Sequence, residues 1–355
     1  MLIIRPCQMK DLEDLMALSK TVGRGMTSMP ADREAWLKKI EATERAFSDQ
    51  GKKDPMSTYF MVLEDPESGH VIGSTAIYTG IGLDRPFYSY KISTLVSSCN
   101  DLAVTRQARV LSMVNDYTGA TEVGSLFVSP EFRKPGMGQF LSRARFLAMA
   151  DFPERFSETV MAELRGWQDK DGNSPLWENL GRQFFGIDFQ EAVNTVALKG
   201  TQFISDLMPK YPIYIDLLPQ DAREVIGKPN DSSAPALHML KKEGFQFAGY
   251  VDLFDGGPSV QCARDEIHTV RESVKGDVRV SGHVQDDDAR FMLSNGSEQD
   301  YRVVLAPARL AADGTLLIQQ AAADALLMDT SHDFSSLPVR FMPFVQNPHS
   351  AAYAA

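Results

Sequence analysis

The clearest hydrophobic pattern in this chain lies between residues 122 and 150. Residues 122–128 (EVGSLFV) form a short apolar run that Ser129 and Pro130 end, which predicts a buried strand because proline cannot donate to a ladder. Beyond a turn, apolar residues recur every three or four positions, which predicts a helix with one face turned inward. They are Phe140, Leu141, Ala144, Phe146, Leu147 and Ala150.

The turn between this strand and this helix places two cationic residues before two glycines: Arg133, Lys134, Gly136 and Gly138. Glycine lets a backbone approach a ligand closely, and the free N–H groups and positive dipole at a helix start favour a phosphate. The pattern therefore predicts an anion-binding turn. An ordinary strand–turn–helix with a surface Arg/Lys pair is the alternative interpretation.

Shorter apolar patterns predict further strands and helices on both sides of this segment. Residues 59–64 and 70–79 are typical of a hairpin, and residues 87–97 of a third strand. Residues 159–165 are expected to form a strand beside 122–128. The other predicted elements are strands at 2–5 and 246–254 and helices at 10–19, 32–48, 174–185, 221–226 and 234–243.

The order of these elements predicts an α+β fold with a mixed central sheet flanked by helices. We expect the core to span residues 1–262 and to contain a large insertion at 166–233. Beyond it the chain changes to short alternating strands and one alanine-rich helix, which predicts a small β-rich domain at 263–345. Residues 346–355 are expected to form a frayed tail.

Composition and charge narrow the class of protein. The 355 residues carry 36 basic and 47 acidic side chains, and the net charge of −11 argues against a nucleic-acid binder. The three cysteines are widely spaced and include no C-x-x-C pair, so neither a disulfide framework nor a metal site is expected. The apolar start is too short for a signal peptide and no run is long enough to span a membrane. We therefore expect a cytoplasmic protein with no membrane partner.

The strand, turn and helix at 122–150 resemble the acyl-CoA pyrophosphate loop of the GNAT superfamily of N-acetyltransferase-like enzymes. The shared pattern is Val128-x-Pro130-Glu131-Phe132-Arg133-x-x-Gly136-x-Gly138. The opening strand and helix are also typical of that superfamily, as is the order of helix, Gly244-Phe245 and strand near residue 250. The resemblance implies a GNAT-like core in which the strands at 122–128 and 159–165 part to admit the pantetheine arm of the acyl-CoA.

A second resemblance covers roughly residues 3–275, and there the chain is similar to the bacterial arginine N-succinyltransferase family, including the paired subunits of its arginine/ornithine version. The shared motifs occur in order and at the family's spacing, whereas the part beyond them matches loosely. They are Gly23-x-Gly25-x-Thr27-x-x-Pro30, Ser125-Leu126-Phe127, Ala162-Glu163-Leu164-Arg165-Gly166, Ser174-Pro175-x-Trp177, Gly181-Arg182-x-Phe184-Phe185, Leu207-Met208-Pro209-Lys210-Tyr211-Pro212 and Gly249-Tyr250-Val251-Asp252-x-Phe254-Asp255-x-Gly257-Pro258.

This resemblance implies transfer of a succinyl group from succinyl-CoA to the α-amino group of L-arginine, the entry step of arginine catabolism, with L-ornithine as an alternative acceptor. It places the family's succinyl-CoA contact on Leu126. The resemblance of the phosphate loop implies further contacts with succinyl-CoA from Val128, Arg133, Lys134, Gly136 and Gly138. No metal ion is expected to take part.

One departure from the family pattern bears on catalysis. The family's proton-donor histidine follows an Ile-Gly-x-x stretch, and here Ile226-Gly227-Lys228-Pro229 leads to Asn230. Asparagine forms hydrogen bonds but cannot donate a proton near neutral pH. Either another group supplies the proton, or the activity is weak, or the chain is an acyl-CoA-binding partner subunit in a homo- or hetero-oligomer.

Acidic side chains supply the remaining candidates for chemistry. Glu122 and Glu163 on the two central strands could act as a general base or hold the cationic end of the substrate, and a surface or salt-bridge role is the alternative. Asp252 and Asp255 are candidates for binding a guanidinium, although turn capping is favoured for Asp255. His238 is expected to be packed within its helix. The loop at residues 23–30 either lines a substrate pocket or simply connects two helices.

Overall fold

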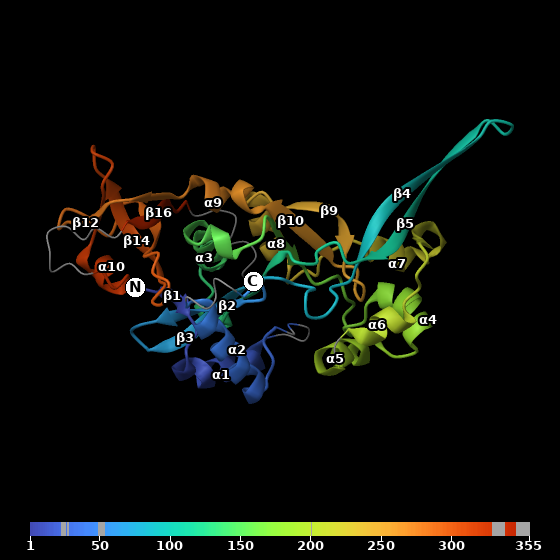
Figure 1. Cartoon of the computed structure of the whole chain (residues 1–355), viewed down its shortest axis with the longest axis horizontal. Coiled ribbons are helices and arrows are strands. Elements are labelled where there is room, and N and C mark those ends of the chain that lie inside the picture. The colour runs from blue at the N-terminus through green and yellow to red at the C-terminus, as the bar shows by residue number, and fades with distance from the viewer. Residues whose placement is uncertain (23–25, 27, 49–53, 200, 329–337, 346–355) are drawn as a thin grey trace. The chain divides into compact units, whose positions relative to one another are not determined.

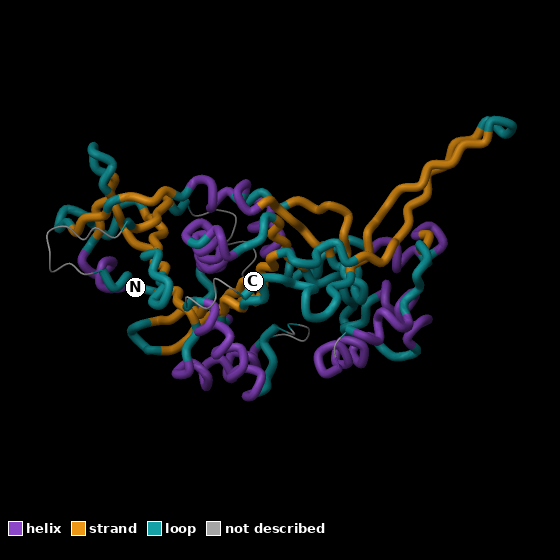
Figure 2. The backbone as a smooth tube through the Cα atoms, viewed as in Figure 1, coloured by secondary structure: helices purple, strands orange, loops and turns teal. Residues whose placement is uncertain are grey.

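The structure is a computed structural model that describes residues 1–22, 26, 28–48, 54–199, 201–328 and 338–345. The chain divides into two compact units. Unit 1 comprises Met1–Thr79, Val123–Glu158 and Ala263–Ala355, and unit 2 comprises Gly80–Glu122 and Thr159–Cys262. Strands and helices alternate without a fixed order in both units (Figure 1, Figure 2), so the predicted α+β class is confirmed. None of the described helices is long and apolar enough to cross a membrane.

Unit 1 contains a sheet with the strand order β11-β16-β13-β14-β1-β2-β3-β6. The predicted hairpin is present as β2 and β3, which pair from Thr58↔Tyr78 to Asp65↔His70. β1 pairs with β2 on one side and with β14 on the other, so strands from the two ends of the chain share this sheet. The strands are β1 Ile3–Pro6, β2 Thr58–Asp65, β3 His70–Tyr78, β6 Thr121–Val128 (from Val123 on), β11 Val274–Gly276, β12 Val278–Val280, β13 Arg290–Ser294, β14 Val303–Leu310, β15 Leu316–Ile318 and β16 Val339–Pro343.

The longer helices of unit 1 lie where the hydrophobic spacing predicts them, but α3 (Met137–Asp151) is buried on nearly all sides between Gln139 and Ala150, so the prediction that only one of its faces is turned inward is wrong. The α-helices are α1 Leu12–Thr21, α2 Arg33–Ala46, α3 Met137–Asp151, α9 His268–Glu272 and α10 Gln320–Ala325. Short 3₁₀ turns lie at η1 Met9–Asp11, η3 Pro130–Phe132, η4 Pro153–Arg155 and η7 Arg264–Glu266. α2 begins where the Asp32 side chain accepts a hydrogen bond from Ala35 N, as an N-cap residue does.

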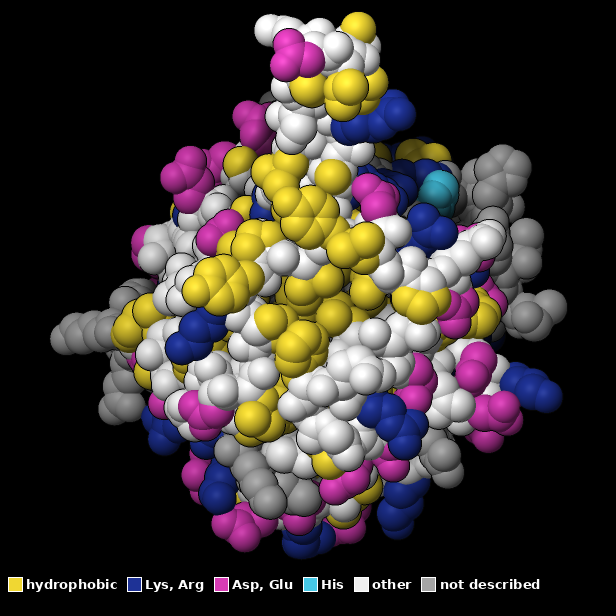
Figure 3. All heavy atoms as spheres, turned by 90° about the vertical axis from the view of Figure 1, so that its right-hand side faces the viewer, with side chains coloured by type: hydrophobic (Ala, Val, Ile, Leu, Met, Phe, Trp, Pro, Cys, Tyr) yellow, Lys and Arg dark blue, Asp and Glu magenta, His cyan; other side chains and the backbone are white. Residues whose placement is uncertain are grey.

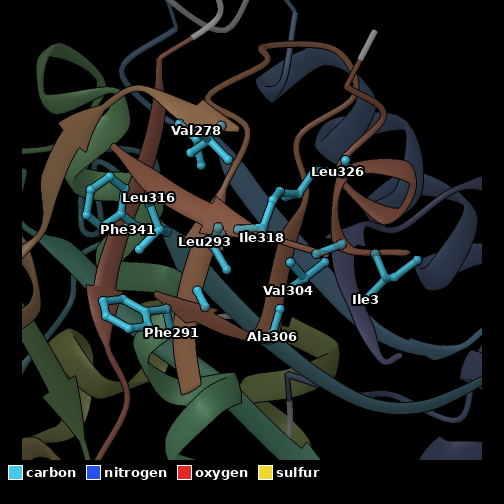
Figure 4. Close-up of a cluster of buried hydrophobic side chains, with 14 residues drawn as sticks. Ile3, Val278, Phe291, Leu293, Val304, Ala306, Leu316, Ile318, Leu326 and Phe341 are labelled. Carbon is cyan, nitrogen blue, oxygen red and sulfur yellow. The ribbon is translucent and has the colours of Figure 1, made fainter. Parts of the chain in front are cut away.

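Residues from both ends of the chain share a hydrophobic core in unit 1 (Figure 4). Ile3 of β1 belongs to the same buried cluster as Leu293 of β13, Val304 of β14 and Phe341 of β16. Burial of such side chains stabilises the folded chain by roughly 1.5–3 kcal/mol each. The domain boundaries predicted at 166–233 and at 262/263 stay predictions, because the sharing of a core does not by itself define a domain.

A buried ion pair fastens α3 to the C-terminal strands of unit 1. The Asp151 side chain at the end of α3 is 1% exposed, and Arg340 Nε donates to it at 2.8 Å. Ser294 Oγ and Tyr301 Oη donate to its other oxygen at 2.6 and 3.2 Å. Burial raises the pKa of Asp151, and the hydrogen bonds from Ser294 and Arg340 oppose that rise. The carboxylate is thus satisfied on both oxygens, as a buried charge must be.

Unit 2 contains the strand order β7-β10-β9-β4-β5-β8, and the first two residues of β6 pair with β7. Its longest feature is a hairpin of two 11-residue strands, β4 and β5. The strands are β4 Ser89–Cys99, β5 Val104–Val114, β7 Thr159–Glu163, β8 Ile213–Tyr214, β9 Gln246–Val251 and β10 Pro258–Ala263. The helices are the π-helical turn η5 Trp177–Gly181, α4 Arg182–Phe185, α5 Phe189–Lys199, α6 Gln202–Leu207, the 3₁₀ turn η6 Ile215–Leu217, α7 Gln220–Val225 and α8 Ala234–Lys242.

β5 is a long strand that the hydrophobic pattern does not predict. Its first half carries Arg106, Gln107 and Arg109 and is exposed on both faces, so it lacks the alternation of a half-buried strand. The predicted third strand, β4, is present, but it pairs with β5 and β9, whereas β3 lies between β2 and β6.

Two sequence-based predictions fall outside the described residues. They are the pocket-or-connector role of the loop at 23–30, of which 23–25 and 27 are not described, and the tail at 346–355.

Candidate active site

The turn for which we predict anion binding lies in unit 1, between β6 and α3. Gly136 immediately precedes α3 and has φ +83°, in the left-handed region that glycine adopts without strain. The first turn of α3 contains no acidic residue, so no carboxylate of that turn neutralises the positive end of the helix. The N–H of Met137 donates to the Lys134 carbonyl at 3.1 Å, so the helix start offers an anion the N–H groups of Gly138 and Gln139, before the first intrahelical bond from Phe140.

The two cationic residues of the turn are exposed. Arg133 Nε donates to the carbonyl of Val128 at 3.1 Å, and its guanidinium lies 5.8 Å from the centre of the Phe127 ring. This hydrogen bond uses Nε and leaves the two terminal nitrogens of Arg133 for other acceptors. Lys134 follows it directly. The loop thus has the cation and the free N–H groups that a pyrophosphate requires.

β6 is bent at Ser125, which has φ +51°, a value that residues other than glycine rarely adopt. Two hydrogen bonds hold the bend: Ser125 Oγ lies 2.6 Å from Tyr78 Oη, and Ser74 Oγ donates to the Ser125 carbonyl at 3.0 Å. Leu126, the expected succinyl-CoA contact, comes directly after the bend and is half-buried. Backbone strain of this kind concentrates at functional sites, and the residue pattern gives no signal for it.

The opposite end of β6 belongs to unit 2, where it pairs with β7 as predicted. The pairing is parallel and joins Thr121 to Val160 and Glu122 to Met161. β6 therefore carries the candidate Glu122 in one unit and the candidates Leu126 and Val128 in the other.

Four carboxylates gather in unit 2, and we call them the carboxylate cluster: Glu122, Glu163, Asp252 and Asp255. Glu163 is the last residue of β7, and Asp252 and Asp255 lie in the turn between β9 and β10. Gly166 allows this turn to approach the end of β7, since a Cβ there would lie 2.5 Å from Asp255 Oδ1. The structure thus brings together all four acidic candidates from the sequence.

Burial and mutual repulsion raise the pKa of these carboxyl groups. Burial, reinforced by the charges of Asp252 and Glu122, raises the pKa of Glu163 well above its ordinary value. Burial also raises the pKa of Asp252 well above its ordinary value and raises that of Asp255. Carboxyl groups perturbed in this way are typical of sites that bind a cation or transfer a proton.

The members of the carboxylate cluster differ in how they are held. Asp252 Oδ1 accepts from Phe254 N and Asp255 N at 2.7 and 2.8 Å, and Asp255 Oδ1 accepts from Gly257 N at 2.9 Å. The turn-capping role favoured for Asp255 is therefore confirmed, and Asp252 shares it. In contrast, Glu163 Oε1 is buried without a hydrogen-bond partner among the described residues. Glu163 is thus a member of the cluster with a buried oxygen that no hydrogen bond within the described part of the chain satisfies.

Asn230 contacts the chain just beyond β7, two residues after Glu163. Its N–H donates to the Arg165 carbonyl at 2.7 Å, and the preceding Pro229 forms a bridge with Gly166. Its side-chain Oδ1 accepts from Ser232 N and Ser232 Oγ at 3.0 and 2.7 Å. The position to which the family resemblance assigns a proton donor is thus beside the carboxylate cluster, and its side chain is engaged in a local turn.

Other candidate proton donors are less suited to the site. His238 is exposed on α8, so the prediction that it is packed is wrong. Tyr117 is buried and donates to Gln261 Oε1 at 2.9 Å, and burial raises the pKa of its hydroxyl. Arg165 has a buried Nε without a hydrogen-bond partner among the described residues, and burial lowers its pKa. The part of the chain that the structure describes contains no group of side chains suited to a metal ion.

Comparison with known proteins covers nearly the whole chain. The family described as arginine N-succinyltransferase beta subunit matches residues 2–269, and the C-terminal domain of the same family matches residues 275–330. Arginine N-succinyltransferase subunit beta of Pseudomonas aeruginosa is 37% identical over 338 residues, which cover 95% of this chain and 98% of that protein. Arginine N-succinyltransferase of Escherichia coli O6:K15:H31 is 38% identical over 326 residues, with coverage of 92% and 94%.

A solved structure is also similar over nearly its full length. Arginine/ornithine succinyltransferase subunit AI from Pseudomonas aeruginosa superposes with a TM-score of 0.85 at 32% sequence identity. The superposition covers 97% of this chain and 98% of that chain.

Proposed function

The chain belongs to the arginine N-succinyltransferase beta subunit family, and from that premise we propose that it transfers the succinyl group of succinyl-CoA to the α-amino group of L-arginine by direct attack. It is an acyltransferase of arginine catabolism. The observation that carries the proposed chemistry is the carboxylate cluster, in which Glu163 has an unpartnered buried oxygen two residues before Arg165, whose carbonyl accepts from Asn230 N.

We propose that the turn before α3 holds the pyrophosphate of succinyl-CoA. The N–H of Gly138 and the guanidinium of Arg133 supply donors, Lys134 supplies charge, and Gly136 lets the backbone take the required shape. Leu126 and Val128 on β6 would contact the rest of the acyl-CoA. The parallel pairing of β6 with β7 and the strand–turn–helix order support a GNAT-like core.

We assign the carboxylate cluster to the acceptor, which carries two positive charges as free L-arginine. Glu163 takes the proton from the α-ammonium group because its raised pKa suits it to act as a base near neutral pH. Glu122 adds negative charge that favours a cation at the same place. Asp252 and Asp255 are fixed by backbone N–H groups, and they shape the turn around Glu163.

In the proposed reaction the succinyl group passes directly to the amine, with no metal and no covalent enzyme intermediate. The neutral amine nitrogen attacks the thioester carbonyl carbon, a C–N bond forms, and the C–S bond breaks to release the CoA thiolate. The nitrogen loses its second proton as the amide forms, and one proton is consumed when the thiolate is protonated. Asn230 cannot supply that proton, but a thiol is acidic enough to leave as a thiolate. We expect the missing acid to slow the reaction by about 10²–10⁴-fold rather than abolish it.

The decisive experiment uses the purified chain alone with succinyl-CoA and L-arginine and follows thiol release. We expect measurable turnover, and the Asn230→His variant should be faster by at least about tenfold, since it restores a proton donor at a backbone position that the Arg165 carbonyl fixes. Asp231→His, at the exposed neighbouring residue, is the matched control and should leave the rate unchanged. L-Ornithine in place of L-arginine tests the acceptor in the same assay.

A second candidate function rests on the asparagine at position 230. The chain would then be a catalytically weak or inactive subunit that binds acyl-CoA and assembles with a related, histidine-bearing subunit of a hetero-oligomeric arginine/ornithine succinyltransferase. Absence of turnover for the chain alone, with turnover restored by adding a histidine-bearing homologue, would establish this function and refute the first. We also expect the chain to act in the cytoplasm, and cell fractionation tests that expectation.

A further inference from the structure

A short antiparallel bridge in unit 2 joins the chain just beyond β7 to the segment that leads into α8. Its partners are Gly166 and Pro229. Neighbouring residues of an extended chain point to opposite faces. The face that carries Gly166 is filled by the turn between β9 and β10, since a Cβ on Gly166 would lie 2.5 Å from Asp255 Oδ1. The side chains of the residues next to the bridge therefore lie on its opposite face.

That opposite face, which we call the bridge face, carries Arg165, Trp167, Lys228 and Asn230. Asn230 N donates to the Arg165 carbonyl at 2.7 Å, and Trp167 N donates to the Lys228 carbonyl at 3.0 Å. Arg165 is thus opposite Asn230, and Trp167 is opposite Lys228, and residues opposite each other share a face. Lys228 Nζ accordingly lies 4.5 Å from the centre of the Trp167 ring. Lys228 is exposed and the other three are half-buried, so the bridge face is accessible to a ligand from solvent.

The two cations of the bridge face, Arg165 and Lys228, form no ion pair within the part of the chain that the structure describes. Figure 3 shows acidic and basic side chains interspersed over one face of the molecule, and Arg182 of unit 2 is paired with Glu178 at 2.7 Å. In Arg165, by contrast, Nη2 donates to Gln168 Oε1 at 3.2 Å, and the buried Nε has no hydrogen-bond partner among the described residues. A buried donor without an acceptor costs free energy, so this guanidinium is suited to an anionic ligand.

The acidic residues near Arg165 do not neutralise it. Burial lowers the pKa of Arg165, and the charge of Asp255 opposes that fall. Asp255 Oδ1 nevertheless accepts from Gly257 N at 2.9 Å, and the two side chains form no ion pair within the described residues. Glu163 lies two residues before Arg165, and two residues of extended chain span about 7 Å. A ligand of the size of an amino acid can therefore reach both side chains.

We propose that the bridge face binds a carboxylate group of a substrate and that Arg165 is the residue that recognises it. The inference rests on the proposed function, because both substrates of that reaction carry a carboxylate. L-Arginine has one next to the amine that reacts, and the succinyl group has one two methylene groups beyond the carbonyl that is attacked. A planar guanidinium with free N–H donors matches a carboxylate in both charge and geometry.

Such a site makes Arg165 a specificity-determining residue. A substrate without the carboxylate would leave the buried Nε unsatisfied, and a site built to hydrogen-bond a group strongly rejects analogues that lack it. The bound carboxylate would also hold the reacting end of its substrate near position 230, whose backbone N–H is fixed on the Arg165 carbonyl.

The test measures binding to the full-length protein by isothermal titration calorimetry, with ligands that differ only in the carboxylate. One pair is L-arginine and agmatine, in which hydrogen replaces the α-carboxylate, titrated in the presence of CoA. The other is succinyl-CoA and butyryl-CoA, in which a methyl group replaces the distal carboxylate. In at least one pair we expect the wild type to bind the carboxylate-bearing ligand about 10–100-fold more tightly, and Arg165→Gln to bind both members equally. The pair that responds identifies the source of the carboxylate.

Three further variants define the role of the guanidinium. Arg165→Lys keeps the charge but not the planar fork, so it should retain only part of the preference. Lys228→Gln should weaken the preference less than Arg165→Gln does, because Lys228 is exposed. Arg223→Gln, on the exposed surface of α7, removes the same charge and is the matched control that should leave both preferences unchanged.

The outcomes separate the carboxylate site from the proposed function. Unchanged binding of agmatine and butyryl-CoA by Arg165→Gln would establish that this variant is folded. A preference that survives in Arg165→Gln, or an equal loss of all four ligands in it, would overturn the proposal. A wild type that binds these ligands without distinguishing the members of either pair would refute the carboxylate site alone. A wild type that binds none of the four would refute the proposed function itself.

Discussion

The ionised form of Glu163 destabilises the folded state, and the pH dependence of the free energy of unfolding follows from the direction of the Glu163 pKa shift. Burial and neighbouring charges raise its pKa above the ordinary value. The folded chain therefore binds this proton more tightly than the unfolded chain does. The stabilising effect of protonation is fully present below the ordinary pKa of glutamate and is lost as pH rises through the raised one.

We predict that Glu163→Gln stabilises the protein at neutral pH while impairing its reaction. The amide removes a buried like charge, so the free energy of unfolding at pH 7 should rise by on the order of 1 kcal/mol. The difference from the wild type should be near zero around pH 4, where the glutamate is protonated, and should grow with pH. The value of kcat/KM for L-arginine should fall by about 10²–10⁴-fold. Urea unfolding at several pH values and the thiol-release assay measure the two effects.

Glu41→Gln, on the exposed surface of α2, is the control for this substitution. It should change neither stability nor rate beyond experimental error. A Glu163→Gln variant that is less stable than the wild type at pH 7 would mean that the carboxylate is favourably paired, and the role as base would have to be abandoned.

At this scale the sequence predicts chemistry better than conformation. Glu122, Glu163, Asp252 and Asp255 could be named from their motifs, and the structure brings them together. The left-handed bend at Ser125 could not be predicted, because serine gives no sign of a positive φ and the bend is held by Tyr78 and Ser74 from another strand. The backbone hydrogen bond between Asn230 and Arg165 could not be predicted either, because it joins segments far apart in the chain.

The start of α3 is the element on which the cofactor half of the proposal depends, and its two glycines have different tasks. Gly136 has φ +83°, so Gly136→Ala should lower the free energy of unfolding by about 1–2 kcal/mol. Gly138 is inside the helix, where Gly138→Ala should cost no stability and could add up to about 1 kcal/mol. Both methyl groups obstruct the approach of a pyrophosphate, so both variants should bind CoA about tenfold more weakly.

Chemical denaturation and isothermal titration calorimetry with CoA separate these two effects. Unchanged CoA affinity in Gly138→Ala would contradict the assignment of this turn to the pyrophosphate, whatever happens to Gly136→Ala.

Elements that bury apolar residues could be predicted from the sequence, and those exposed on both faces could not. The hairpin of β2 and β3 and the helix α3 follow from their apolar spacing. β5 does not, because its outer half is exposed on both sides and alternation disappears where neither face is buried.

For the molecule as a whole, the contact between α3 and the C-terminal strands decides how unit 1 holds together. Asp151 bonds to Arg340, Ser294 and Tyr301 while almost fully buried. Asp151→Ala should therefore lower the free energy of unfolding by about 3–5 kcal/mol, because it leaves the Arg340 guanidinium without its partner in a buried place. Asp324→Ala, on the exposed side of α10, is the control and should change it by less than about 0.5 kcal/mol.

Thermal and urea unfolding of both variants measure this prediction. A loss in Asp151→Ala no larger than in Asp324→Ala would indicate that the C-terminal strands are held independently of α3, as the predicted separate domain at 263–345 implies. Long-range features of this kind lie beyond local patterns: the pairing of Ile3 with Val304 joins residues about 300 positions apart, and neither strand carries a sign of its partner.

The backbone hydrogen bond at Asn230 has a consequence for the evolution of this chain. The hydrogen bond from the Asn230 N–H to the Arg165 carbonyl is made by the main chain and would survive replacement of the side chain. Asparagine and histidine codons differ by one base, so loss and recovery of a proton donor at this position are each one mutation apart. A lineage could therefore pass between a catalytic subunit and a supporting one without rebuilding its fold, and the choice would be open to selection in either direction.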